Sequence, residues 1–150
     1  MRRRFITSLA ATSALLSPVQ AQSPPPTATP RAIVLDFFDL VFTQKRVAEG
    51  FARHVGAVYI QHNPRVPDGA EPAIRFLAGR FRDNPQASND LKRVIAEGNL
   101  VVLHHHSRNN PQDRGLAIMD IFRVEGGLIV EHWDVIQPVP ETAANPNGMF

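Results

Sequence analysis

The segment from Asn99 to Gln137 constrains the fold of this chain more than any other. It contains three apolar runs of strand length, separated by turn residues. The first run carries a histidine triplet at positions 104–106, the second carries Asp120, and the third carries His132. Such runs, bounded by Gly, Asn and Asp, predict an antiparallel meander. A buried carboxylate or imidazole is costly unless it is paired, so these polar residues are candidates for chemistry.

The N-terminus predicts export. Three arginines follow Met1, an apolar run extends from Phe5 to Leu16, and Ala21 ends a small-residue motif of the kind that a signal peptidase recognises. We therefore expect residues 1–21 to be a signal peptide, whose removal leaves a periplasmic or secreted protein. The run is too short to span a bilayer, so no membrane contact is expected after cleavage. The arginines are compatible with twin-arginine or Sec export.

Loss of this segment changes the charge of the chain. Three of the 16 Lys and Arg residues lie in it, and none of the 14 Asp and Glu residues does. The mature chain therefore has 13 basic and 14 acidic residues and a net charge of −1. This balance gives no electrostatic basis for nucleic-acid binding. The chain has no cysteine, which excludes disulfides and a thiol nucleophile.

The mature chain predicts one domain with short flanking segments. Residues 22–30 form a proline-rich linker, and residues 141–150 form an extended C-terminal tail. The intervening residues 31–140 are enough for a single core but not for two. Helical patterns precede the strands, so we expect an α+β domain. Its three N-terminal helices would pack on a curved antiparallel sheet of about four to six strands, as a cone-shaped barrel.

The apolar spacing gives the elements of this domain. Positions three and four residues apart predict helices over residues 31–44, 47–55 and 70–83. The third helix would keep its arginines in solvent. Residues 58–62 form either a helical turn or a strand, and residues 91–97 form a strand that a Gly-Asn turn joins to the meander.

The strand patterns predict which polar side chains share a face. A hairpin centred on Gly126 pairs Asp120 with His132 and places Arg123 and Glu131 together on the opposite face as a cross-strand ion pair. Side chains alternate along a strand, so two histidines of the triplet point one way and the third points the other. We expect the pocket wall to contain Asp120 with His104, His106 and His132. The alternative is that these histidines are hydrogen-bonded core residues without chemistry.

Several segments together resemble the SnoaL-like polyketide cyclases, members of the superfamily that includes ketosteroid isomerase, scytalone dehydratase and nuclear transport factor 2. The resemblance covers about residues 31–140, and the segments are Tyr59–Pro64, Val94–Val101, His104–His106, Asp120–Val124 and Ile129–Gln137. It implies a cone-shaped α+β barrel and an intramolecular aldol condensation driven by proton removal next to a carbonyl. It also implies that no metal or organic cofactor is needed.

The resemblance implies roles for three residues: Asp120 is the acid/base, assisted by His106 on the preceding strand and by His62 from the helical side. A carboxylate in a dry pocket is expected to have a raised pKa, as suits a general base. An imidazole or Tyr59 could donate a hydrogen bond to a developing enolate oxygen. The substrate is expected to be a small apolar molecule, bound by Tyr59, His104, His132 and Phe122.

Two rival functions remain open from the sequence. In one, His104 and His106 ligate a metal ion together with His62 or His132. In the other, the domain binds small molecules without catalysis. In either case a homodimer is expected, because an apolar sheet face would need cover. The residues predicted to form that face are Val101, Leu103, Ile121, Ile129, Trp133 and Val135.

Overall fold

The computed structural model describes residues 28–150, so the predicted signal peptide and most of the linker lie outside the described residues. The helical elements are α1 (Pro30–Phe38), the π-helical turn η1 (Asp39–Thr43), α2 (Val47–His54) and α3 (Ala70–Asp83). The strands are β1 (Val55–Gln61), β2 (Ser88–Glu97), β3 (Leu100–Arg108), β4 (Leu116–Glu125) and β5 (Leu128–Pro138). No helix in this described range is long and apolar enough to cross a bilayer.

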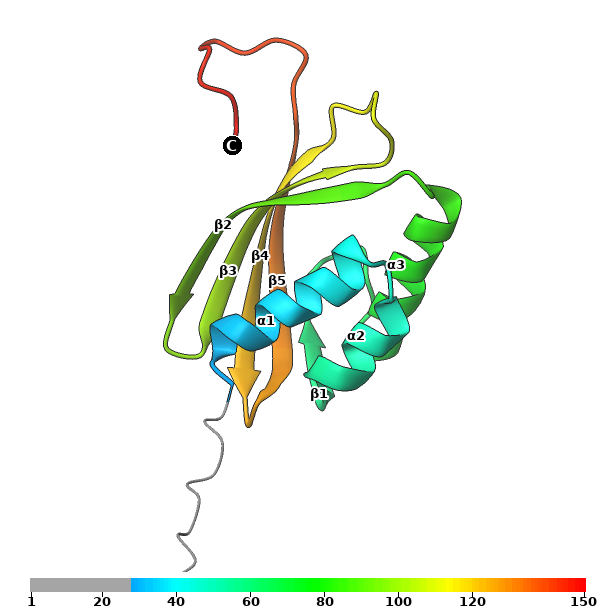
Figure 1. Ribbon diagram of the computed structural model, residues 1–150, viewed down its shortest axis with the longest axis vertical. Coiled ribbons are helices and arrows are strands. Elements are labelled where there is room, and N and C mark those ends of the chain that lie inside the picture. Colours follow the sequence, from blue (N-terminus) through cyan, green and yellow to red (C-terminus); the bar gives the residue numbers. More distant parts are fainter. Residues whose placement is uncertain (1–27) are drawn as a thin grey trace, which may run out of the picture.

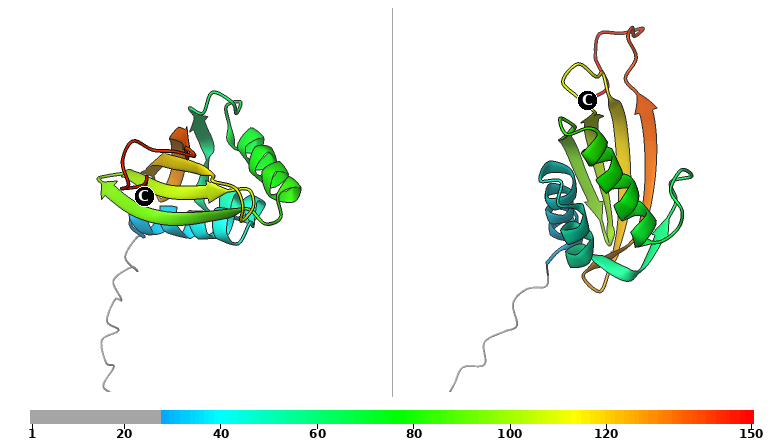
Figure 2. Two further views of the ribbon diagram at one scale, coloured as in Figure 1. Left: turned by 90° about the horizontal axis from the view of Figure 1, so that it is seen from above. Right: turned by 90° about the vertical axis from the view of Figure 1, so that its right-hand side faces the viewer.

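The strands form one open, mixed sheet in the order β1-β5-β4-β3-β2. Strands β2 to β5 make the predicted antiparallel meander, whereas β1 pairs in parallel with β5 at the edge. The helices lie on one face of the sheet (Figure 1), and the sheet curves around α1 (Figure 2). The predicted α+β fold is therefore confirmed. Residues 58–62, which the sequence left open, belong mostly to a strand.

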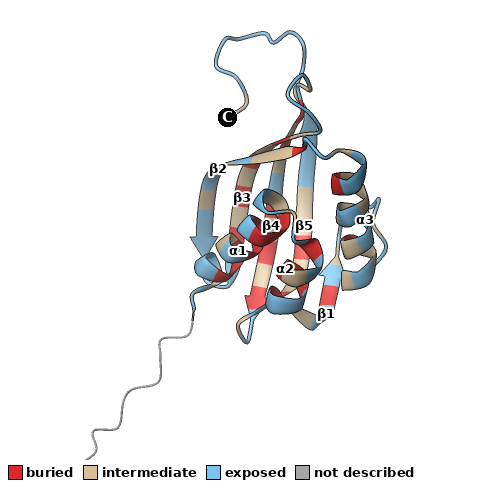
Figure 3. Cartoon of the chain, turned by 45° about the vertical axis from the view of Figure 1, so that its right-hand side comes forward, coloured by how far each residue is buried: buried red, intermediate tan, exposed pale blue. Residues whose placement is uncertain are grey.

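The core lies between the helices and the sheet, where the buried residues gather (Figure 3). Phe37 of α1 packs edge-on against Phe51 of α2 and Phe122 of β4. Val101 and Leu103 of β3 are fully buried beneath these helices. Burial of each large apolar side chain contributes about 1.5–3 kcal/mol, so this layer of contacts stabilises the domain.

The hairpin between β4 and β5 differs from the predicted one. Its turn is Gly126-Gly127, where both residues have positive φ, and a register irregularity follows Arg123. Asp120 therefore pairs with Asp134, and His132 pairs with Phe122, so the predicted pairing of Asp120 with His132 is wrong. The predicted ion pair is confirmed, since Arg123 Nε donates to Glu131 Oε2 at 2.6 Å.

The outer face of the sheet carries fewer apolar residues than predicted. Val101, Leu103 and Ile129 belong to the buried core, so their side chains cannot contact a second protomer on the outer face. Val135 is exposed, and residues 139–150 continue beyond β5 without helix or strand. The chain end turns back onto this face (Figure 1), where the Phe150 ring stacks on His106 with centroids 4.4 Å apart.

Candidate functional site

A cavity of about 270 Å³ lies between the helices and the concave face of the sheet. Aromatic rings form much of its wall, among them Phe37, Phe51 and Phe122. The carboxylate of Asp120 also lines the cavity, although the residue is only 5% exposed. An apolar cavity with a few convergent polar groups is the usual form of a small-molecule site.

Two imidazoles hold the Asp120 carboxylate. His105 Nε2 lies 2.9 Å from Asp120 Oδ2, and His132 Nε2 lies 3.1 Å from Oδ1. His105 is 1% exposed and His132 is 9% exposed. Leu103 of β3 is the direct neighbour of Asp120 on β4, so odd-numbered side chains of β3 share the face of Asp120. This alternation brings His105 to the carboxylate.

Hydrogen bonding fixes the protons of this group. Gln61 Oε1 accepts the backbone N–H of Asn63 at 2.9 Å, which identifies that atom as the amide oxygen. His132 Nδ1, at 2.9 Å from the same oxygen, must therefore donate to it. One further proton then lies between His132 Nε2 and Asp120 Oδ1. His105 Nδ1 is buried with no hydrogen-bond partner among residues 28–150, so a neutral His105 protonated on Nε2 avoids a buried orphan N–H.

The same contacts set the acidity of Asp120. Burial by itself raises the pKa of this carboxyl, but the hydrogen bonds from His105 and His132 and the positive charge of His132 outweigh it and hold the pKa below its usual range. The predicted rise in the pKa of Asp120 is therefore wrong, because the carboxylate is buried but has hydrogen bonds from two imidazoles. The shared proton consequently belongs to His132, and the pair is an imidazolium and a carboxylate.

Tyr59 lies beside this pair. Its ring stacks on His132 with centroids 6.4 Å apart and an interplanar angle of 9°. Burial, followed by the negative charge of Asp120, raises the pKa of the phenol well above its usual range. Tyr59 thus remains an O–H donor at any pH at which the domain works, and it cannot act as a base.

This shift can be tested directly, because Tyr59 is the only tyrosine in the chain. We expect no tyrosinate absorbance from the folded protein at its ordinary pKa of 10.0 and a normal titration in urea. A folded-state pKa above the unfolded value means that the contribution to stability is present below pH 10 and is lost as the pH rises further. Tyrosinate absorbance from folded protein near pH 10 would contradict this result. The variant Tyr59→Phe has no tyrosine and therefore gives the background absorbance.

A second polar network, centred on Asn63, holds Gln61 in place beside His132. Asn63 donates from its side-chain amide to Asp134, and its Oδ1 accepts the backbone N–H of Arg65 at 2.8 Å. Asn63 is buried, and its backbone N–H binds the Gln61 oxygen that also receives His132. The loop after β1 thus fixes the tautomer and the ring position of His132.

Arg80 of α3 also lines the cavity instead of facing solvent as predicted. Its Nη2 donates to Ser107 Oγ at 2.8 Å and to the carbonyl of Arg108 at 3.3 Å. Burial lowers the pKa of this guanidinium, and the charge of Asp113 partly opposes that effect. Arg75 and Arg82 on the same helix are exposed, as predicted.

The cavity brings together four of the seven predicted site residues. Asp120, His132, Tyr59 and Phe122 all line it. The structure places the other three, His104, His106 and His62, outside the cavity.

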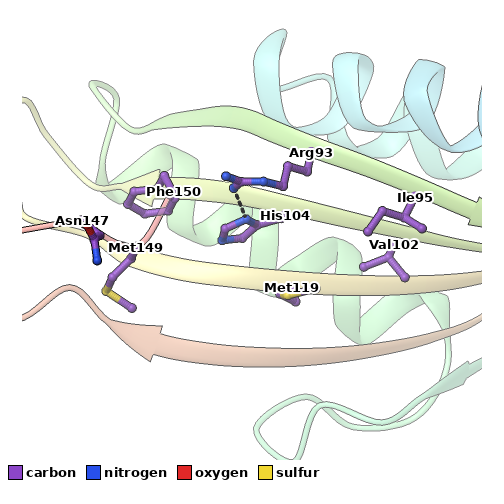
Figure 4. Close-up of a pocket in the computed structure, with 9 residues that line it drawn as sticks. Arg93, Ile95, Val102, His104, Met119, Asn147, Met149 and Phe150 are labelled. Atoms are coloured by element: carbon purple, nitrogen blue, oxygen red, sulfur yellow. Dashed lines mark hydrogen bonds between the residues drawn. The ribbon is translucent and has the colours of Figure 1, made fainter.

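The prediction that His104 and His106 face Asp120 requires correction. The apolar residues of β3 that enter the core are odd-numbered, so the even-numbered histidines point to the outer face. There His104 Nδ1 lies 3.0 Å from Arg93 Nη1. His104 also lines an outer pocket with Met149 and Phe150 of the chain end (Figure 4). His106 Nε2 instead lies 2.7 Å from the carbonyl oxygen of Arg114.

His62 also lies on the outer face. It follows Gln61, whose side chain points inward to His132, so alternation turns His62 outward. Its Nε2 lies 2.8 Å from Glu131 Oε1, and its ring stacks on that of Trp133 with centroids 4.8 Å apart. With a side-chain exposure of 41%, it has no part in the cavity.

Among residues 28–150 the predicted three-imidazole metal site is not assembled, because the ligand atoms of His104 and His106 do not gather with those of His62 or His132. A different set could hold a cation: Asp120, His132 and Asp134 have ligand atoms within 4.8 Å of one another. The hydrogen bonds described above already join these side chains to His105, Gln61 and Asn63. These contacts account for the cluster as a polar network.

Comparisons with known proteins bear on this site. The family model of the SnoaL-like domain matches residues 34–132. No curated protein sequence matches the chain. Among solved structures, a candidate polyketide cyclase from Bacillus cereus is 21% identical, with a TM-score of 0.59 over 71% of this chain and 74% of that one. An NTF2-like protein from Cytophaga hutchinsonii is 18% identical, with a TM-score of 0.58 over 80% and 96% of the two chains. A candidate hydroxylase from Streptomyces galilaeus is also 18% identical, with a TM-score of 0.61 over 72% and 88%. At these identities the structural likenesses establish the fold alone.

Proposed function

Because the chain belongs to the family of SnoaL-like domains, we propose that it is an acid/base enzyme that removes a proton from a carbon next to a carbonyl group. Its substrate would be a small apolar molecule, and the reaction an isomerisation or an intramolecular aldol condensation. The observation that carries the proposal is the Asp120 carboxylate in the wall of the cavity, held by His105 and His132. The proposed chemistry uses only side chains of this chain.

In the proposed reaction, Asp120 accepts the proton and the C–H electron pair moves into the carbonyl, which becomes an enolate. The negative charge on the enolate oxygen is stabilised by a donor in the cavity. Tyr59 O–H is the donor beside Asp120, since it lines the cavity and both N–H groups of His132 are engaged with Gln61 and Asp120. The proton on Asp120 then returns to the product, at carbon in an isomerisation or at the new alkoxide oxygen in an aldol condensation.

Hydrogen exchange tests this proposal without knowledge of the natural substrate. The protein would be incubated in D₂O with a small bicyclic ketone such as 2-tetralone, and deuterium uptake next to the carbonyl would be followed by NMR. We expect Asp120→Asn to slow the catalysed exchange by about 10²–10⁴-fold, the usual contribution of a positioned acid or base. Asp83→Asn, on an exposed carboxylate at the end of α3, is the matched control. Equal exchange by wild type and Asp120→Asn would refute the role of Asp120.

The lowered pKa of Asp120 favours a second candidate, a binding domain without turnover. Two imidazoles hold this carboxylate as an anion, which weakens it as a base. The exchange experiment separates the two functions. A binding domain would retain ligand in the cavity, as seen by NMR shifts, while wild type and Asp120→Asn both leave the ketone unexchanged.

A further inference from the structure

The cavity contains a cation that has no anionic partner within the described part of the chain. Arg80 extends from α3 to β3, where its guanidinium nitrogens contact Ser107, Asn89 and Asn109. Within residues 28–150 every hydrogen-bond acceptor of Arg80 is an uncharged oxygen. The neighbouring carboxylate of Asp113 is engaged elsewhere, since it accepts the backbone N–H groups of Asn109 and Gly115, each at 2.9 Å.

The partners of the Arg80 guanidinium are neutral: four hydrogen-bond acceptors and the Phe81 ring, whose centroid is 5.3 Å away. A guanidinium loses hydration when it is buried, and neutral acceptors replace only part of that stabilisation. The planar fork of arginine matches a carboxylate, with which it forms short, charge-assisted hydrogen bonds. A carboxylate entering the cavity would therefore gain more from Arg80 than from any neutral side chain there.

The position of Arg80 suits a substrate anchor. Ser107, its nearest partner, and His105, which holds Asp120, lie on the same face of β3 two residues apart. Same-face neighbours on a strand are separated by about 7 Å. The guanidinium and the carboxylate of Asp120 thus line separate parts of one cavity, and a molecule with a short apolar spacer could reach both.

We propose that the substrate of this cavity carries a carboxylate, which Arg80 binds while the apolar body of the molecule extends toward Asp120. This inference deepens the proposed function and rests on the cavity being the substrate site. Arg80 would orient the carbon acid relative to the base. It would also discriminate against neutral analogues of the same shape, because these leave the guanidinium unpaired.

Binding of a matched pair of probes tests the proposal. The probes are 3-phenylpropanoate and 3-phenylpropanamide, which share size and shape but differ in charge. Their affinities for the full chain would be measured by isothermal titration calorimetry at neutral pH. We expect the carboxylate to bind about tenfold more tightly than the amide, the low end of the gain from a hydrogen bond to a charged group.

Three variants show whether Arg80 causes that preference. Arg80→Met should abolish it, leaving the two probes with equal affinity, whereas Arg82→Met, on the exposed side of the same helix, should retain it. Arg80→Lys keeps the charge but not the fork, so it should reduce the preference and serves if Arg80→Met does not fold.

Three outcomes would overturn the inference: wild type that binds neither probe, wild type that binds both equally, or Arg80→Met that keeps the preference. Because these measurements involve no turnover, the carboxylate preference can hold even when Asp120→Asn leaves hydrogen exchange unchanged. The two proposals therefore fail separately.

Discussion

Replacing Asp120 with alanine is expected to lower the free energy of unfolding by about 3–5 kcal/mol, because it removes one partner of a buried ion pair. The variant leaves the His132 imidazolium without its carboxylate and His105 Nε2 without an acceptor. Neither ring can turn to solvent, since both are buried. The loss is measured by urea unfolding, with the fluorescence of Trp133, the only tryptophan, as the probe.

A double variant isolates the pair from the cavity that the substitution creates. His132→Leu removes the buried cation, so Asp120→Ala should cost less in that background than in wild type. The difference between the two costs is the coupling energy, expected at about 1–3 kcal/mol. Equal costs in both backgrounds would show that the carboxylate and the imidazole do not interact.

The pH dependence of the same variant has a definite sign. The pKa of Asp120 is lower in the folded than in the unfolded protein, so its contribution to stability is present above the unfolded value of about 3.9. That contribution is lost as the pH falls through this value toward the folded pKa. The difference between wild type and Asp120→Ala should therefore shrink as the pH falls below about 4.

Local sequence patterns predicted the helices and the meander closely. Helix α3 spans the predicted residues 70–83, because its apolar spacing and the following Asn84-Pro85 define both face and end. The predicted helix over residues 31–44 is also present, although its last turn widens into η1. These features depend on residues a few positions apart, which is the range at which sequence patterns are informative.

The position of the histidines depends on long-range pairing and was not predictable in the same way. Alternation separates His105 from its two neighbours, but only the register with β4 decides which set faces the core. Leu103 and Val101 gave the available signal, since large apolar residues at odd positions favour the odd-numbered face. The same reading would have identified His105 as the partner of Asp120.

Arg80 illustrates a second limit of the sequence. It lies on a helix with Arg75 and Arg82, and nothing in the local pattern distinguishes the three. Only the tertiary structure places Arg80 where its side chain reaches Ser107 of β3, and it leaves the other two exposed. Asn63 is similar, because its contact with Asp134 depends on the parallel pairing of β1 with β5.

Gly115→Ala is the second substitution with a large expected effect, about 3–4 kcal/mol of destabilisation. Gly115 has φ of +81°, which costs an alanine about 1–2 kcal/mol before any contact is considered. Its Cβ would also collide with the carbonyl oxygen of Ser107 and approach Arg108 Cγ to 2.7 Å. Since a backbone oxygen in a paired strand cannot move aside freely, steric strain adds to the conformational cost.

Gly126→Ala separates these two costs. Gly126 has φ of +57°, and an added Cβ there would have no atom within 4 Å, so only the conformational term of about 1–2 kcal/mol applies. Urea unfolding should therefore rank Gly115→Ala as clearly less stable than Gly126→Ala, and equal losses would mean that the Ser107 strand yields. If it holds rigidly, the strain is transmitted to Ser107, which contacts Arg80. Gly115→Ala should then also weaken the preference of the cavity for 3-phenylpropanoate, whereas Gly126→Ala should leave it unchanged.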